Sequence, residues 1–151
     1  MRILVSACLL GQKCKYNGGD NYSEAVTEYV RGHEVIPVCP ELAGGLSVPR
    51  SPCEIVDGVV MNTDGENVDK AFRDGAALCV GLAKEKKIDL AILQSRSPSC
   101  GVKQVYDGTF SGRLTEGKGI FAALLEEAGI PAIDAEEAVA VGRIRAAKET
   151  G

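Results

Sequence analysis

Apolar runs and stretches with helical character alternate along this chain. The apolar runs, which predict buried strands, cover Ile3–Ala7, Val35–Val38, Ile88–Gln94 and Ile130–Ile133. Capping residues and apolar positions at helical spacing predict helices over residues 24–31, 67–87, 119–128 and 135–148. Because strands that alternate with helices are typical of βαβ units, we predict an α/β fold. It is expected to be a three-layer Rossmann-like sandwich with a mostly parallel central sheet.

Three segments between these elements have the composition of loops. They cover residues 15–20, 42–57 and 106–118, and each is rich in glycine or proline. The middle segment is long for a loop in a compact domain, and such loops are usually functional. Residues 58–63 after it are expected to form a short strand or one arm of a hairpin.

Length and charge narrow the class of protein. The chain has 151 residues, 45% of them hydrophobic and 25% charged, which predicts one globular domain over residues 1–151. The net charge is −4 and there is no basic run, so the sequence gives no strong nucleic-acid signal. No apolar stretch approaches the roughly 20 residues that cross a membrane, and no leader segment is evident. We therefore expect a cytoplasmic protein without a membrane partner, and the sequence carries no signal of oligomeric state.

Cysteine content suggests metal binding or catalysis. The chain has six cysteines, and a reducing cytosol disfavours structural disulfides. No C-x-x-C pair is present, so the spacing is not that of a zinc ribbon. The only histidine, His33, has the context of a surface turn. A mechanism that pairs cysteine with histidine would depend on that residue alone.

Cys8, Cys39 and Cys100 share a position relative to the predicted strands, because each lies at or just past a strand's carboxyl end. In an open parallel sheet these ends meet at the edge where ligands bind. Converging thiolates favour an iron–sulfur cluster, zinc or Cu(I). With three protein ligands, a cluster would keep one iron open as a Lewis acid toward a soft atom. The competing interpretation is that each cysteine is a small buried hydrophobic residue.

The other cysteines are weaker candidates. Cys79 lies on the apolar face of the predicted helix 67–87, so we assign it to the core. Cys14 and Cys53 lie in loops, where either could approach the site or replace a ligand.

Polar residues beside the cysteines are the candidates for acid–base work. Glu41 follows Cys39 by two residues and could act as a general acid or base, although loop carboxylates are usually solvated. Ser97 precedes Cys100 by three residues and could bind substrate or relay a proton, or simply cap a turn. Arg50 and Arg96 could each hold an anion or a polar heterocycle, or remain solvated at the surface.

Five ordered motifs resemble the thiouracil desulfurase family. They are Val5-Ser6-Ala7-Cys8-Leu9-Leu10-Gly11, Tyr16-Asn17-Gly18, Val38-Cys39-Pro40-Glu41, Gly45-Leu46-Ser47-Val48-Pro49-Arg50 and Ser95-Arg96-Ser97-Pro98-Ser99-Cys100-Gly101. The similarity runs from about Ile3 to Ile133. It implies a [4Fe–4S] cluster on Cys8, Cys39 and Cys100 with one open iron. By the same resemblance, Glu41 and Ser97 are the catalytic residues.

The resemblance also implies an activity. It would be the non-redox, hydrolytic desulfuration of a thiolated base, 2- or 4-thiouracil, to uracil with release of sulfide. A thiolated nucleoside is a further substrate to consider. Three alternatives stay open: an iron–sulfur or sulfide carrier without turnover, a zinc or cysteine-nucleophile enzyme, and a nucleotide-binding domain. The last lacks a phosphate-binding fingerprint.

Overall fold

All strands of the central sheet run in the same direction. The computed structural model describes residues 1–140, and within them the sheet has the order β2-β1-β5-β8 with every neighbouring pair parallel. Its strands are β1 (Arg2–Ser6), β2 (Glu34–Val38), β5 (Leu90–Leu93) and β8 (Ala132–Asp134). These four strands match the four predicted apolar runs to within a few residues.

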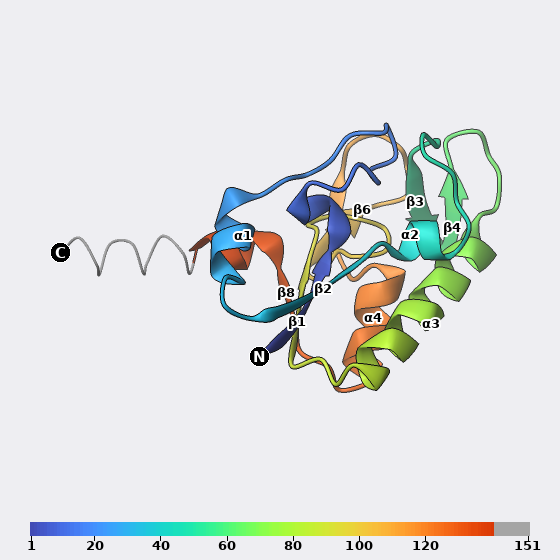
Figure 1. Cartoon of the computed structure of the whole chain (residues 1–151). Helices are drawn as coiled ribbons and strands as arrows, with labels where there is room; N and C mark the ends of the chain where they lie inside the picture. The colour runs from blue at the N-terminus through green and yellow to red at the C-terminus, as the bar shows by residue number, and fades with distance from the viewer. Residues whose placement is uncertain (141–151) are drawn as a thin grey trace.

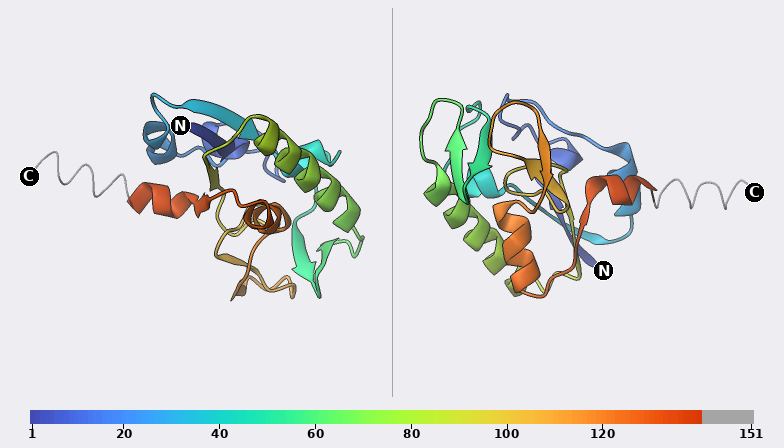
Figure 2. Two further views of the ribbon diagram at one scale, coloured as in Figure 1. Left: turned by 90° about the horizontal axis from the view of Figure 1, so that it is seen from below. Right: turned by 180° about the vertical axis from the view of Figure 1, so that it is seen from behind.

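Helices cover both faces of this sheet. The remaining elements, in chain order, are η1 (Ala7–Leu10), α1 (Glu24–Tyr29), α2 (Pro40–Ala43), β3 (Cys53–Val56), β4 (Val59–Asn62), α3 (Asp69–Glu85), β6 (Gln104–Tyr106), β7 (Leu114–Glu116) and α4 (Ile120–Glu127). In Figures 1 and 2, α3 and α4 lie together along one face, and α1 lies on the other beside the helical residues 135–140. The predicted helix 135–148 is thus present over residues 135–140, and the rest of it falls outside the described residues.

Strand β1, one of the two central strands, contributes side chains to both hydrophobic cores. Successive side chains of a strand point to opposite faces. Leu4 accordingly packs with residues of α3 and α4, whereas Ile3 and Val5 pack with Val26 of α1 and with Ala138. The side chains of Ile3, Leu4, Val5 and Val26 are all fully buried. The two cores make the fold a three-layer α/β sandwich, which confirms the predicted class.

Two of the predicted loops contain regular structure. Residues 42–57 include the end of α2 and the strand β3, which pairs with β4 as an antiparallel hairpin. The glycine-rich segment 106–118 includes β7, which pairs with β6 as a second hairpin. Both hairpins lie beyond the carboxyl ends of the sheet strands (Figure 1). Their strands are three or four residues long, and such short strands form through pairing with neighbours more than through local preference.

Helix α2 is held against α3 by direct contact between backbones. A Cβ atom on Gly75 would lie 1.8 Å from the carbonyl oxygen of Pro40, and one on Gly44 would lie 2.0 Å from the carbonyl oxygen of Ala71. Only glycine allows backbones to approach so closely. Gly75, which lies inside the predicted helix 67–87, therefore sets the place of α2, which carries Glu41 and follows Cys39.

Helix α4 holds the loop that contains Cys100. Amides at its start donate to carbonyls of that loop, from Ile120 to Pro98 and from Phe121 to Ser99, both at 2.9 Å.

Among the described residues, no helix has the length and apolar character needed to span a bilayer.

Candidate functional site

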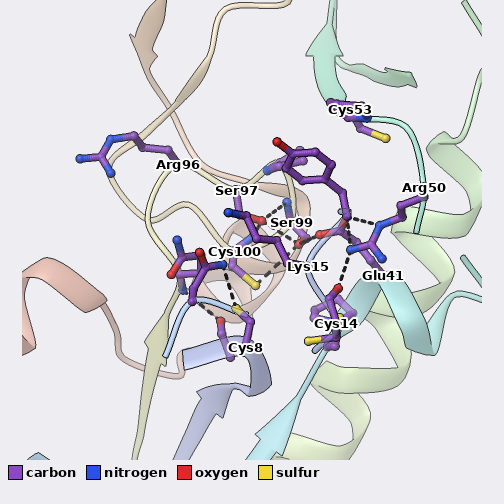
Figure 3. Close-up of a pocket in the computed structure, with 18 of the residues that line it drawn as sticks. Cys8, Cys14, Lys15, Glu41, Arg50, Cys53, Arg96, Ser97, Ser99 and Cys100 are labelled. Carbon is purple, nitrogen blue, oxygen red and sulfur yellow. Dashed lines mark hydrogen bonds and ion pairs between the residues drawn. The ribbon is translucent and has the colours of Figure 1, made fainter. Parts of the chain in front are cut away.

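One cavity at the carboxyl edge of the sheet collects every predicted site residue. Its volume is about 640 Å³, and its lining includes Cys8, Cys39, Cys100, Glu41 and Ser97. Three sources contribute to it: the ends of the parallel strands, the loop that contains Cys14, and the two hairpins. Figure 3 shows the thiol, carboxyl and hydroxyl groups gathered at its centre.

Cys8 is presented by a single turn of 3₁₀ helix that follows β1. The turn ends at Gly11, whose φ of 95° lies in the left-handed region that favours glycine. The chain then makes an excursion and returns to the same place, where the Asn21 amide donates to the Cys8 carbonyl oxygen at 3.0 Å. The Asn21 side-chain Nδ2 also donates to Cys8 Sγ at 3.5 Å. Asn21 therefore fixes both the backbone and the sulfur of this residue.

Cys39 lies between β2 and α2, at the N-cap position of the helix. Its carbonyl oxygen accepts the first helical hydrogen bond, from the amide of Ala43 at 2.9 Å. The Cys14 thiol, which is buried, forms a hydrogen bond with the Cys39 side chain. Cys14 thus lies beside one of the three predicted ligands, as the sequence left open.

Cys100 lies on a tight turn beyond β5, with 4% of its surface exposed. Ser97 Oγ accepts the amides of Ser99, at 3.2 Å, and of Cys100, at 3.1 Å. The hydroxyl groups of Ser6 and Ser99 form hydrogen bonds with the Cys100 sulfur. Ser97 therefore does cap a turn, and that turn orients a thiol toward the cavity.

A continuous hydrogen-bond chain joins Glu41 to Ser97. Ser99 Oγ donates to Glu41 Oε2 at 2.9 Å, and the hydroxyl oxygens of Ser97 and Ser99 are 3.0 Å apart. Ser97 Oγ already accepts two amides, so its own hydrogen is left to donate toward Ser99. The carboxylate side chain of Glu41 is only 14% exposed, and Arg50 forms an ion pair with it. This arrangement places a buried acid–base group and two hydroxyls beside Cys100.

Burial keeps the Cys8, Cys14 and Cys100 thiols of this cavity in their uncharged form unless a cation joins them. Burial raises the pKa of Cys8 above its ordinary value, and it raises the pKa of Cys100 to about 12 and of Cys14 to about 12. Charge on Cys39 adds to the rise in the pKa of Cys8, so these sulfurs lie near enough to interact. Metal binding at such a site would release protons, because thiolates are the ligands.

The chemistry of the donor set fits an iron–sulfur cluster. Within residues 1–140, no three Cys, His, Asp or Glu side chains converge closely enough to bind one metal ion. Five cysteines nevertheless line the cavity, and Cys8, Cys39 and Cys100 reach it from three strand ends. Soft thiolates are the ligands that iron–sulfur clusters favour, so these cysteines suit such a group.

The other residues considered in the sequence analysis lie at the edge of the cavity or away from its thiols. Cys53 lines the outer edge of the cavity, and its thiol donates to the Ser51 carbonyl oxygen at 3.4 Å. Cys79 is buried in the core on α3. His33 contacts the N-terminal amine of the chain and does not line the cavity. Arg96 points away from the thiols in Figure 3 and forms an ion pair with Glu136.

Sequence reasoning missed two members of the site. Ser99 is 1% exposed and joins Glu41 to Ser97, yet the motif Ser-Pro-Ser-Cys offers two serines and no local signal separates them. Asn21 reaches Cys8 from a position thirteen residues away. A polar side chain next to a strand-end cysteine in space, but not in sequence, leaves no pattern to read.

The chain is similar to known proteins over the whole of the segment that forms this cavity. The sequence matches the model of the 2-thiouracil desulfurase family over residues 3–137, which include every residue that lines the cavity. It is 41% identical over 145 residues to the uncharacterized protein YbbK of Bacillus subtilis (strain 168), covering 89% of this chain and 96% of that protein. Among solved structures, the [4Fe-4S]-dependent thiouracil desulfidase TudS is similar, with a TM-score of 0.85 and 37% identity over 90% of this chain and 91% of that chain.

Proposed function

We propose, from the premise that this chain belongs to the 2-thiouracil desulfurase family, that it converts 2- or 4-thiouracil into uracil and sulfide with a [4Fe–4S] cluster. The observation that carries the proposal is the meeting of Cys8, Cys39 and Cys100 with Glu41 and Ser97 in one cavity. Membership of the family supports an enzyme that acts on a thiolated base.

Cys8, Cys39 and Cys100 would hold the cluster. When bound by only three thiolates, it supplies an iron with an open position, a Lewis acid suited to a soft sulfur atom. Asn21 and Ser6 stabilise the thiolate forms, because each forms a hydrogen bond with a ligand sulfur. Cys14 and Cys53 line the cavity as additional thiols.

The chain's own groups carry the hydrolytic part of the reaction. One water is consumed: a C–O bond replaces the C–S bond of the ring, and the sulfur leaves as sulfide. No electrons are exchanged, so no redox partner is required. Glu41 takes a proton from the water as it attacks the ring carbon, and Ser97 orients the water or the ring through its hydroxyl. Acid–base catalysis of this kind contributes about 10²–10⁴-fold.

The amount of uracil formed per chain distinguishes the proposed enzyme from a carrier protein. Protein reconstituted without air is mixed with an excess of 2-thiouracil or 4-thiouracil, and uracil and sulfide are measured over time. We expect many equivalents of uracil per chain, with an equal amount of sulfide. A carrier would bind sulfide up to the number of its clusters and form no uracil, and that result would reject the proposal. Thiolated nucleosides tested in parallel define whether the free base is preferred.

A further inference from the structure

The side chain of Arg50 is nearly buried and forms three hydrogen bonds within the protein. The side chain is 9% exposed, and its Nε donates to Glu41 Oε1 at 3.2 Å. One terminal nitrogen donates to the Cys14 carbonyl oxygen at 2.9 Å, and the other to the Ser47 carbonyl oxygen at 3.2 Å. Its backbone amide also donates to the Tyr16 carbonyl oxygen at 2.7 Å. Three of the five N–H donors of this guanidinium are thus engaged by acceptors of the protein itself.

These bonds tie together three separate parts of the cavity wall. Glu41 belongs to α2, Cys14 and Tyr16 belong to the loop that follows Cys8, and Ser47 belongs to the segment before the β3–β4 hairpin. Figure 3 shows Arg50 between Glu41 and Cys14, with its bonds drawn to both.

The two oxygens of Glu41 are held from opposite sides. Oε1 accepts from Arg50 and Oε2 accepts from Ser99. With both oxygens engaged, the carboxylate has one favoured orientation, facing the Ser97–Ser99 hydroxyl pair. Loss of the guanidinium would leave a nearly buried carboxylate without its counter-charge, which favours rotation toward solvent.

We propose that Arg50 is a positioning residue, which orients the Glu41 carboxylate and fastens the Cys14–Tyr16 loop against the cavity. The proposal rests on the proposed function where it concerns turnover, and on geometry alone where it concerns the loop and the carboxylate. Its physical basis is the planar fork of arginine, which satisfies three acceptors in fixed directions. A lysine ammonium supplies the charge but cannot reproduce the fork.

The test compares Arg50→Met, Arg50→Lys and a matched control, Arg73→Met. Arg73 also forms an ion pair with a carboxylate, Asp69 at 2.7 Å, and donates to a carbonyl oxygen, that of Gly58 at 2.8 Å, but it lies outside the cavity. For each protein we would measure turnover per loaded cluster, iron content, deuterium uptake by residues 12–18, and the crystallographic orientation of Glu41.

We expect Arg50→Met to lower kcat per cluster on the order of 10²-fold, the size of effect that a misplaced catalytic group produces. Arg50→Lys should recover part of this loss. Deuterium uptake by residues 12–18 should rise in Arg50→Met and stay at the wild-type level in Arg73→Met. In crystals of Arg50→Met, the Glu41 carboxylate should leave Ser99.

Two results would overturn the proposal. One is an Arg50→Met protein whose kcat per cluster is unchanged and whose losses are confined to iron content or thermal stability. The other is unchanged deuterium uptake together with an unmoved Glu41 carboxylate. If the wild-type protein has no turnover, the proposed function fails by itself, and the last two measurements still decide the positioning role.

Discussion

The two walls of the cavity are built in different ways. The inner wall, which consists of Cys8, Cys39, Cys100 and the nearby Glu41, lies at or just beyond strand ends and is fixed by backbone contacts. The outer wall consists of the Cys14 loop and the two hairpins, and long side chains fasten it in addition to backbone bonds. Arg50 secures the loop, and Glu54 on β3 accepts the amides of Gly108, at 3.0 Å, and Phe110, at 3.2 Å, from the second hairpin.

This difference indicates that the two walls have different roles. Groups that would hold a cluster need fixed positions, and backbone attachments to a sheet provide them. Groups that meet a substrate at the mouth can be adjusted by changing a few side chains. Phe110, which is 38% exposed with a φ of 54°, is an example of an outer-wall residue held in an uncommon conformation by such bonds.

The largest expected effect comes from the carboxylate of the inner wall. Glu41→Gln should lower kcat by about 10²–10⁴-fold, because the general base is lost while the side-chain shape remains. Iron and acid-labile sulfide per chain should stay at the wild-type level. Steady-state kinetics with 4-thiouracil and iron analysis check both parts. Full activity in this variant would remove Glu41 from the mechanism.

The next effect concerns how the inner wall is placed. Gly75→Ala should destabilise the fold by about 3 kcal/mol, since its Cβ would lie 1.8 Å from the Pro40 carbonyl oxygen. Gly81→Ala in the same helix is the matched control, because nothing lies within 4 Å of its Cβ position. It should stabilise the protein by about 0.5–1 kcal/mol. Thermal unfolding followed by circular dichroism compares the two, and equal shifts would contradict the close packing of α2 on α3.

A carboxylate of the outer wall should matter less. Glu54→Ala removes the acceptor for two loop amides, and such hydrogen bonds contribute about 1 kcal/mol each or somewhat more. We expect kcat/KM to fall by less than about tenfold, with faster hydrogen exchange in residues 107–112. A loss as large as that of Glu41→Gln would end the distinction between the walls.

The smallest effect is expected at the junction of β4 and α3, which supports the first hairpin. Burial opposes ionisation of Asp69, but hydrogen bonds from Arg73 and the Val60 amide outweigh it and hold the pKa below its ordinary value of 3.8. This stabilisation is fully present above pH 3.8 and is lost as the pH falls through the folded-state pKa. Asp69→Asn should therefore cost about 1 kcal/mol at pH 7 and progressively less below pH 4. A cost that does not change with pH would contradict this assignment.

The inner wall could be predicted from sequence, whereas of the outer wall only one hairpin arm, expected over residues 58–63 and present as β4, could be. Buried strands leave continuous apolar runs, so the positions of Cys8, Cys39 and Cys100 at their ends follow from local pattern and parallel topology. Helix α2 and both hairpins are short, and pairing across distant segments forms them. The role of Arg50 depends on acceptors from residues 14, 41 and 47 that meet only after folding. No local pattern of residues encodes that meeting.

Iron and acid-labile sulfide per chain, measured in protein purified without air, test the central claim most directly. Wild-type protein and the outer-wall variant Cys53→Ser should both contain iron and sulfide in the proportions of one [4Fe–4S] cluster per chain. Cys8→Ser, Cys39→Ser and Cys100→Ser should each lose it. Wild-type protein that contains zinc or no metal, or a Cys100→Ser variant with undiminished iron, would contradict the account.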